Sequence, residues 1–210
     1  MSADLSKYWS QVRQTKIGWV HPDDEELLGK EPHSFNLAFP PPAFVGDVTT
    51  ARVIILVANG GYDPEVTPSE FEAPNSEAKY LKRLSYPTKA NWAEVAPYYR
   101  GVNYAELVFS GKAAAVNACA YRSRKISEEP DNKRLLKRLP SVHFNRAWLV
   151  DVILPQVVAG QRFIVGKRHG LWDLPGAVKN SSGFFPDPAP VSPHLSNVVL
   201  ERLQQVLACV

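Results

Sequence analysis

Continuous apolar stretches alternate with amphipathic ones along this chain. Apolar runs rich in β-branched residues or alanine occur at 51–58 (ARVIILVA), 111–121 (GKAAAVNACAY) and 162–167 (RFIVGK). A run without polar alternation is typical of a strand that is covered on both faces. We therefore predict three buried strands at these positions, and a short fourth strand near Gly176 to Lys179.

Segments of helical composition or spacing separate these runs. We predict helices at 5–12, 75–84, 91–99, 132–139 and 144–160, and a last helix in the segment from residue 192 to the end. In that last segment Leu203 and Leu207 lie one helical turn apart. The helix at 144–160 is expected to end near Gly160, with Pro155 as the place where it would bend.

Strands separated by helices predict a parallel sheet with helices on both faces. We expect an α/β fold with three layers, α/β/α, around a central, mostly parallel four-stranded sheet. A length of 210 residues suits one hydrophobic core. We therefore expect a single domain over 1–210, in which residues 1–45 supply an N-terminal helix and a proline-rich lead-in. In such a sheet, ligands bind beyond the carboxyl ends of the strands.

The composition, with 45% apolar and 21% charged residues, is that of a soluble globular protein. No run approaches the roughly 18 to 20 apolar residues of a membrane span, and the first residues lack a secretory signal. We expect a cytoplasmic monomer without a membrane partner and with reduced cysteines. Neither Cys119 nor Cys209 has a second Cys or His at metal-ligand spacing, so we expect no metal and no other cofactor.

The net charge of +3 permits a polyanionic partner without requiring one. Lys and Arg gather most densely at 121–138 (YRSRKISEEPDNKRLLKR). This stretch has two interpretations: a solvated helix with its flanking loop, or a rim that faces phosphates.

Polar residues follow or interrupt the predicted strands. The first strand runs into VANGGYDP, the second carries Asn117, the third leads into GKRHG, and a proline-rich loop leads into VSPHLSN before the last helix. Glycines after a strand let the backbone turn and let a ligand approach closely. Each feature alone also has a structural explanation, as a turn or as a hydrogen-bonded core amide.

Three familiar sites are absent from these loops. VANGGYDP lacks the lysine and the serine or threonine of a Walker loop and does not complete G-x-G-x-x-G, so neither ATP nor a dinucleotide is indicated. No serine stands in G-x-S-x-G, which disfavours a serine hydrolase.

Taken together, these loops resemble the uracil-DNA glycosylase superfamily, particularly its mismatch-specific thymine/uracil branch. That branch has G-I-N-P-G after its first buried strand, and VIILVANGGY places Asn59 on the motif asparagine and Gly60 on the proline. SPHLSN (192–197) resembles the late loop H-P-S-P-L-S with its order altered. Asn117 resembles the strand asparagine that reads the pyrimidine edge. The lost proline and the displaced His194 are departures from the family pattern.

A second register is also open. GYDP (61–64) resembles the G-Q-D-P of the uracil-specific branch, which would make Asp63 the water-activating carboxylate. We prefer Asn59, because it stands where the predicted strand ends and Asp63 falls four residues later.

The resemblance implies a monofunctional DNA glycosylase that flips a pyrimidine out of DNA and hydrolyses its N-glycosidic bond, leaving an abasic site. Water would be positioned by Asn59 or Asp63, and His194 would stabilise the departing base. The implied base-binding residues are Gly60, Gly61, Tyr62, Asn117 and Tyr121. The implied DNA-binding residues are Ser192, Leu195, Ser196, Lys167, Arg168, Arg122 and Arg124, with Leu195 as the wedge that enters the base stack.

Several of these residues keep a structural alternative. Leu195 also fits a core contact of the last helix, and Ser192 or Ser196 also fits a helix cap. Because a glycine pair removes bulk beside the base, we hypothesise that the substrate is a modified pyrimidine, in repair or in antiviral defence.

Two other classes of function stay open. A glycosylase-like module that binds nucleic acid without cleaving it would also suit the two departures from the family pattern. A metal-dependent nucleotide or nucleoside hydrolase using Asp63 and Asp173 is disfavoured, because these acids lack a nearby ligand cluster. We assign no catalytic role to His21, His33 and His143, and treat His169 as a candidate phosphate contact.

Overall fold

The computed structural model describes residues 3–73, 76–92, 95, 97–189 and 192–208. Its centre is a five-stranded sheet in the order β3-β5-β4-β6-β7. The strands are β3 (Phe44–Val45), β4 (Val53–Gly61), β5 (Ala113–Ser123), β6 (Phe163–Gly166) and β7 (Phe184–Pro186). All neighbours pair in parallel except β3, which is antiparallel to β5. The predicted mostly parallel α/β architecture is confirmed, with five strands in place of four.

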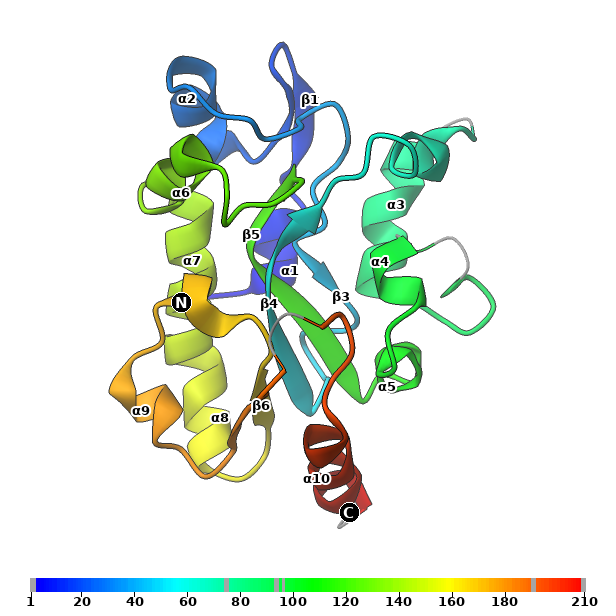
Figure 1. Ribbon diagram of the computed structural model, residues 1–210, viewed down its shortest axis with the longest axis vertical. Coiled ribbons are helices and arrows are strands. Elements are labelled where there is room, and N and C mark those ends of the chain that lie inside the picture. Colours follow the sequence, from blue (N-terminus) through cyan, green and yellow to red (C-terminus); the bar gives the residue numbers. More distant parts are fainter. Residues whose placement is uncertain (1–2, 74–75, 93–94, 96, 190–191, 209–210) are drawn as a thin grey trace.

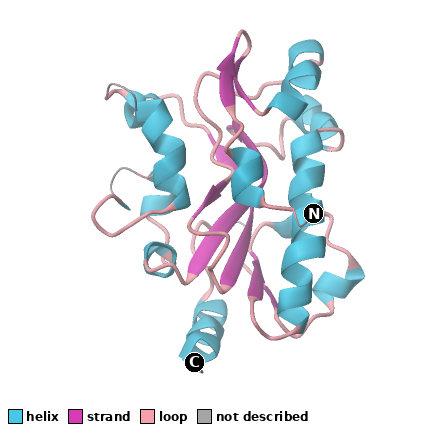
Figure 2. Ribbon diagram, turned by 180° about the vertical axis from the view of Figure 1, so that it is seen from behind, coloured by secondary structure: helices cyan, strands magenta, loops and turns pink. Residues whose placement is uncertain are grey.

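Helices cover both faces of the sheet (Figures 1 and 2). One face carries α3 (Ser76–Ser85), α4 (Pro97–Arg100) and α5 (Ala105–Phe109), and the other carries α6 (Pro130–Leu136), α7 (Pro140–Trp148), α8 (Leu154–Val158) and α9 (Gly176–Lys179). Side chains alternate between two cores along β4: Val53 and Ile55 enter one, and Ile54 and Leu56 enter the other. This alternation is the two-residue period of a strand with both faces buried.

The first 45 residues are more than a lead-in. They form α1 (Leu5–Trp9), a hairpin of β1 (Arg13–Thr15) and β2 (Gly18–Val20), α2 (Pro22–Lys30) and the edge strand β3. The predicted helix at 5–12 is confirmed but shorter. We did not predict the hairpin, because strands of three residues are too short to display a period.

The last strand lies later than predicted. Residues Gly176–Lys179 form the short helix α9, and the strand is β7, eight residues further on. A four-residue apolar segment fits either structure, so its pattern did not decide between them. The helix α10 (Asn197–Ala208) closes the chain as predicted.

The long helix predicted at 144–160 begins earlier and is interrupted. After α7 the chain makes a π-helical turn, η3 (Leu149–Ile153), and then continues as α8. Pro155, in the first turn of α8, has no backbone N–H, which explains why the wider turn precedes it. Of the helix predicted at 91–99, the structure describes a 3₁₀ conformation at Trp92 and the helix α4 from Pro97 onward, while 93, 94 and 96 lie outside the described residues.

Within the described ranges, no helix is both long and apolar enough to cross a bilayer. Cys119 is buried and free, and Cys209 lies outside the described residues. The described elements also include the 3₁₀ turns η1 (Pro68–Phe71), after β4, and η4 (His169–Trp172), after β6.

Candidate functional site

Strand β4 does not end at Ala58, as the apolar pattern predicted, but continues along β5 to Gly61. Its pairing with β6 ends at Leu56, so the last part of β4 forms a ribbon with β5 alone. The register shifts between Asn59, which lies opposite Cys119, and Gly60, which lies opposite Arg122. Such a bulge bends a strand and changes the direction of the residues that follow it.

Asn59 stabilises this bulge. Its Nδ2 donates to the carbonyl oxygen of Gly60 at 2.8 Å, to Oγ of Ser123 at 3.0 Å and to the carbonyl oxygen of Ser123 at 3.4 Å. The carbonyl acceptors fix which end of the carboxamide carries the N–H groups. Its other end, Oδ1, therefore remains as an acceptor.

The two glycines differ in their surroundings. A Cβ on Gly60 would lie 2.4 Å from the carbonyl oxygen of Ala120 and 2.9 Å from Cδ of Pro42, whereas a Cβ on Gly61 would meet nothing within 4 Å. Gly60 therefore permits close backbone packing and does not open a base pocket, which corrects the expectation that both glycines make room for a ligand. Gly61 does border open space.

A pocket of about 200 Å³ opens beyond this ribbon, on the side of α4. Tyr62, Asp63, Tyr98 and Tyr99 are among its lining residues, and Arg124 stands at its rim. We call it the Asp63 pocket. Oδ1 of Asp63 accepts the backbone N–H groups of Glu65 at 2.8 Å and Val66 at 3.0 Å, which orients the exposed carboxylate.

Asn117 lies directly behind this pocket. It is 1% exposed, and its Nδ2 donates to the carbonyl oxygen of Pro42 at 2.5 Å and to the hydroxyl of Tyr99 at 2.9 Å; both partners line the Asp63 pocket. Because these bonds occupy its N–H groups, Asn117 leaves Oδ1 buried without a hydrogen-bond partner. Burial raises the pKa of Tyr99 far above its ordinary value, so the phenol keeps its proton.

Arg122 lines this pocket, but its side chain is buried and is not exposed on the protein surface. It is 2% exposed, and its guanidinium donates to the carbonyl oxygen of Gly61 at 3.1 Å, to Glu70 at 3.2 Å and to the hydroxyl of Tyr80 at 2.7 Å. Its Nε also donates to the carbonyl oxygen of Pro40. The expected DNA contact of Arg122 is therefore wrong: its donors are directed into the protein interior.

A second, wider pocket of about 390 Å³ lies beside Asn59. We call it the Asn59 pocket. It is bounded by the loop after β5, with Arg124 and Lys125, and by the segment after β6, with Arg168 and Leu171. Because Arg124 lines both pockets, the two are neighbours.

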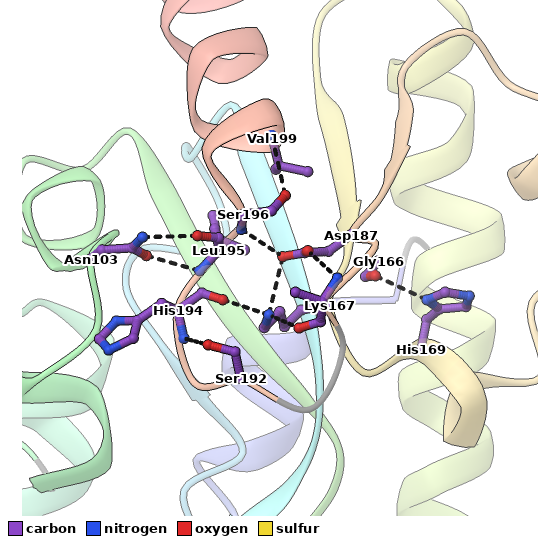
Figure 3. Close-up of polar contacts among 11 residues, drawn as sticks. Asn103, Gly166, Lys167, His169, Asp187, Ser192, His194, Leu195, Ser196 and Val199 are labelled. Carbon is purple, nitrogen blue, oxygen red and sulfur yellow. Dashed lines mark hydrogen bonds and ion pairs between the residues drawn. The ribbon is translucent and has the colours of Figure 1, made fainter.

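Lys167 is buried beneath the segment that leads into α10 (Figure 3). We call this segment the 187–196 loop; it includes most of the late SPHLSN motif. Its ammonium donates to Oδ2 of Asp187 at 3.1 Å and to the carbonyl oxygens of Ala189 and His194, each at 2.5 Å. Asp187 also accepts the N–H groups of Ala189 and Ser196. The prediction that Lys167 contacts DNA is wrong, because its three N–H groups all serve the 187–196 loop.

Leu195 is in the core. It is 2% exposed and packs in the cluster that contains Val199 and Leu203 of α10. Asn103 holds its backbone from the other side, accepting its N–H at 2.9 Å and donating to its carbonyl oxygen at 2.9 Å (Figure 3). The wedge prediction is therefore corrected in favour of the core contact, which was the alternative.

The rest of the late loop is more exposed. The hydroxyl of Ser196 accepts the N–H of Val199 at 3.4 Å and so caps α10, and Ser192 accepts the N–H of His194 at 3.0 Å. The ring of His194 is exposed and points away from Lys167 (Figure 3). The three candidate catalytic residues thus lie in three settings: Asn59 and Asp63 in adjacent pockets, and His194 on the anchored loop.

Tyr121 does not face a ligand. It is fully buried, and its hydroxyl donates to Oδ2 of Asp24 at 2.6 Å and accepts the N–H of His21 at 3.1 Å. The base-binding role expected for Tyr121 is wrong, because its ring packs in a core cluster that contains Leu28 of α2. Sequence reasoning missed Tyr98 and Tyr99, since neither lies after a strand and only the fold brings them to Asp63.

Within the described residues, no group of three or more His, Cys, Asp or Glu side chains could hold a metal ion. Asp63 and Asp173 are both described residues, so neither belongs to such a group. Nδ1 of His169 donates to the carbonyl oxygen of Gly166 at 3.0 Å, at the end of β6. Comparisons of the chain with protein-family models, with curated proteins and with solved structures found no match.

Proposed function

We propose that the protein is a DNA glycosylase whose Asp63 pocket holds a pyrimidine flipped out of DNA. The proposal rests on one observation: this pocket is lined by a carboxylate, by tyrosine rings and by a phenol whose hydroxyl is oriented by a hydrogen bond from an amide. Asp63 supplies the carboxylate, Tyr62 and Tyr98 supply rings, and Asn117 orients the hydroxyl of Tyr99. Aromatic faces stack on a base, and polar groups at the pocket floor read its edge.

Breaking an N-glycosidic bond places positive charge on the sugar and negative charge on the departing base. The Tyr99 hydroxyl accepts from Asn117, so its own O–H is available to donate to a carbonyl oxygen of the base. A donor oriented in advance stabilises the negative charge that develops on that oxygen. Asp63 carries the opposite charge at the pocket mouth, where it orients water and stabilises the positive sugar.

This assignment gives the water-positioning role to Asp63, the alternative in the sequence analysis, and not to Asn59, which we preferred from the sequence. Asn59 uses its amide N–H groups to secure the bulge, which supports a role in directing residues 61–63 towards the pocket. Gly61 borders open space, which supports a substrate with a substituent on the ring, as a modified pyrimidine has.

The test is a base-release assay on oligonucleotides that carry uracil, mismatched thymine or modified cytosines. We expect Asp63→Asn to lower the rate by about 10²-fold or more and Tyr99→Phe by about 10²-fold, because each change removes one group from the transition state. Asn59→Ala is the comparison, and we expect it to retain more activity than Asp63→Asn.

Greater loss in Asn59→Ala than in Asp63→Asn would move the water site to the Asn59 pocket. If no substrate yields a lyase-sensitive abasic site, the glycosylase proposal is wrong. Binding of the same oligonucleotides without any product would then support the second candidate, a nucleic-acid-binding module. The burial of Leu195 favours that candidate, because the late loop exposes no leucine that could hold a base pair open.

A further inference from the structure

We infer that the Asn59 pocket is a second nucleotide subsite, which holds the unit of the strand next to the flipped one. This inference rests on the proposed function, since it takes the Asp63 pocket as the place of the flipped base. At about 390 Å³ the Asn59 pocket is larger than the Asp63 pocket of about 200 Å³.

The charge of the pocket indicates an anionic ligand. Every ionisable residue that lines it is a cation: Arg124, Lys125 and Arg168. Lys125 pairs with Glu128 at 3.3 Å, but both side chains are about two-thirds exposed, at 69% and 65%. Exposed pairs of this kind contribute little and exchange readily, so Lys125 is available to a phosphate.

The uncharged part of the wall indicates more than a bare phosphate. Ile126 and Leu171 present apolar surface, and Asn59 presents Oδ1, the acceptor left by its bonds to the bulge. An anion gains nothing from either feature. A nucleotide uses both, because its sugar and base cover apolar side chains and its exocyclic amine or ring N–H donates to an amide oxygen.

The two pockets have a fixed relation to each other. Ser123, at the end of β5, accepts the N–H of Tyr62 at 3.1 Å through its carbonyl oxygen and the Nδ2 of Asn59 at 3.0 Å through its hydroxyl. Arg124 follows directly and lines both pockets. A phosphate on Arg124 would therefore lie between two nucleotides, one in each pocket.

The experiment measures the salt dependence of binding to a short fluorescent single-stranded DNA, by anisotropy, for the full chain. Lys125→Ala and Arg168→Ala change cations that line the Asn59 pocket and do not line the Asp63 pocket. We expect each to reduce the slope of log K against log salt by about 0.7, the value for one phosphate contact on a single strand. Lys137→Ala and Arg138→Ala, exposed residues of the same basic stretch, are matched controls and should leave the slope unchanged.

Competition adds a second readout. Thymidine monophosphate should displace the labelled strand at lower concentration than inorganic phosphate does, and Leu171→Asp should remove that difference, because it places a like charge on the apolar wall.

An unchanged slope in both pocket variants, or no DNA binding by the unchanged protein, overturns the second subsite. Equal competition by phosphate and the nucleotide reduces the site to one for phosphate alone and also overturns it. A reduced slope together with no abasic product supports the subsite and rejects the glycosylase proposal, so the two failures are distinguishable.

Discussion

Gly60 and Gly61 are adjacent in the chain, but only Gly60 has surroundings that exclude a side chain. Gly60→Ala would put a methyl group 2.4 Å from the Ala120 carbonyl oxygen, on a bulge that cannot shift without breaking its bonds. We expect a loss of about 1 to 3 kcal/mol in the free energy of unfolding, the usual cost of overpacking. Urea denaturation measures it.

Gly61→Ala is the matched control. Nothing lies within 4 Å of its added Cβ, so the free energy of unfolding should change by less than about 0.5 kcal/mol. If both variants were equally stable, Gly60 would not be packed against β5 in the way described above.

At the scale of elements, the 187–196 loop depends on one buried ion pair. Lys167→Met would remove the ammonium and leave Asp187 buried without its cation. Breaking a buried pair by removing one partner costs about 3 to 5 kcal/mol. We expect a loss of that size in chemical denaturation, together with faster proteolysis inside the loop.

Lys179→Met, on the exposed side of α9, is the control for the loss of a lysine.

The 187–196 loop should also respond to acid. Burial alone would raise the pKa of Asp187, but hydrogen bonds from the Ala189 N–H, Lys167 and the Ser196 N–H lower it overall below the ordinary 3.8. The contribution of this carboxylate is therefore present above pH 3.8 and lost as the pH falls through the lowered pKa. Unchanged proteolysis in Lys167→Met would show that the loop does not depend on the pair.

At the scale of the molecule, His21 joins the N-terminal segment to the sheet, because its backbone N–H donates to the hydroxyl of Tyr121 in β5. Its ring stacks on Tyr8 at 3.9 Å, its Nε2 lies 3.0 Å from the Tyr8 carbonyl oxygen, and its Nδ1 accepts the N–H of Asp23. Burial lowers the pKa of His21 below 6.5, against the attraction of nearby acids. The folded state therefore favours the neutral ring.

This lowered pKa makes stability depend on pH. The contribution of neutral His21 is present above pH 6.5 and is lost as the pH falls from 6.5 towards the lowered pKa, because the unfolded chain takes up the proton first. We expect the free energy of unfolding to fall by up to about 1.4 kcal/mol per pH unit in that window. Denaturation between pH 7 and pH 5 measures it. His21→Gln should flatten the curve, and an equally steep decline in that variant would assign the dependence to another group.

The sequence predicted the fold where a run was long enough to show its period. The apolar runs at 51–58, 111–121 and 162–167 became β4, β5 and β6, because strands buried on both faces must be apolar throughout. Strands of two or three residues, such as β3 and those of the N-terminal hairpin, carry too few positions for a period to be visible. These were missed for that reason.

The candidate site was less predictable, because its geometry depends on contacts between distant residues. Asn59 and Asp63 could be recognised as polar residues near a strand end. The bulge that separates them depends on Ser123, and Tyr99 reaches the site from α4. Burial of Lys167 and Leu195 likewise depends on how the late loop folds back, which their local sequence does not specify.

The edge strand β3 has a consequence for shortening the chain. β5 is buried along all eleven of its residues, and on its outer edge it pairs with β3 and then with Asn36, opposite Arg122. A protein that begins at residue 46 would thus bare an apolar edge with unsatisfied backbone donors and acceptors, a template on which identical chains add strand to strand. The N-terminal fifth of the sequence therefore also guards against self-association into aggregates.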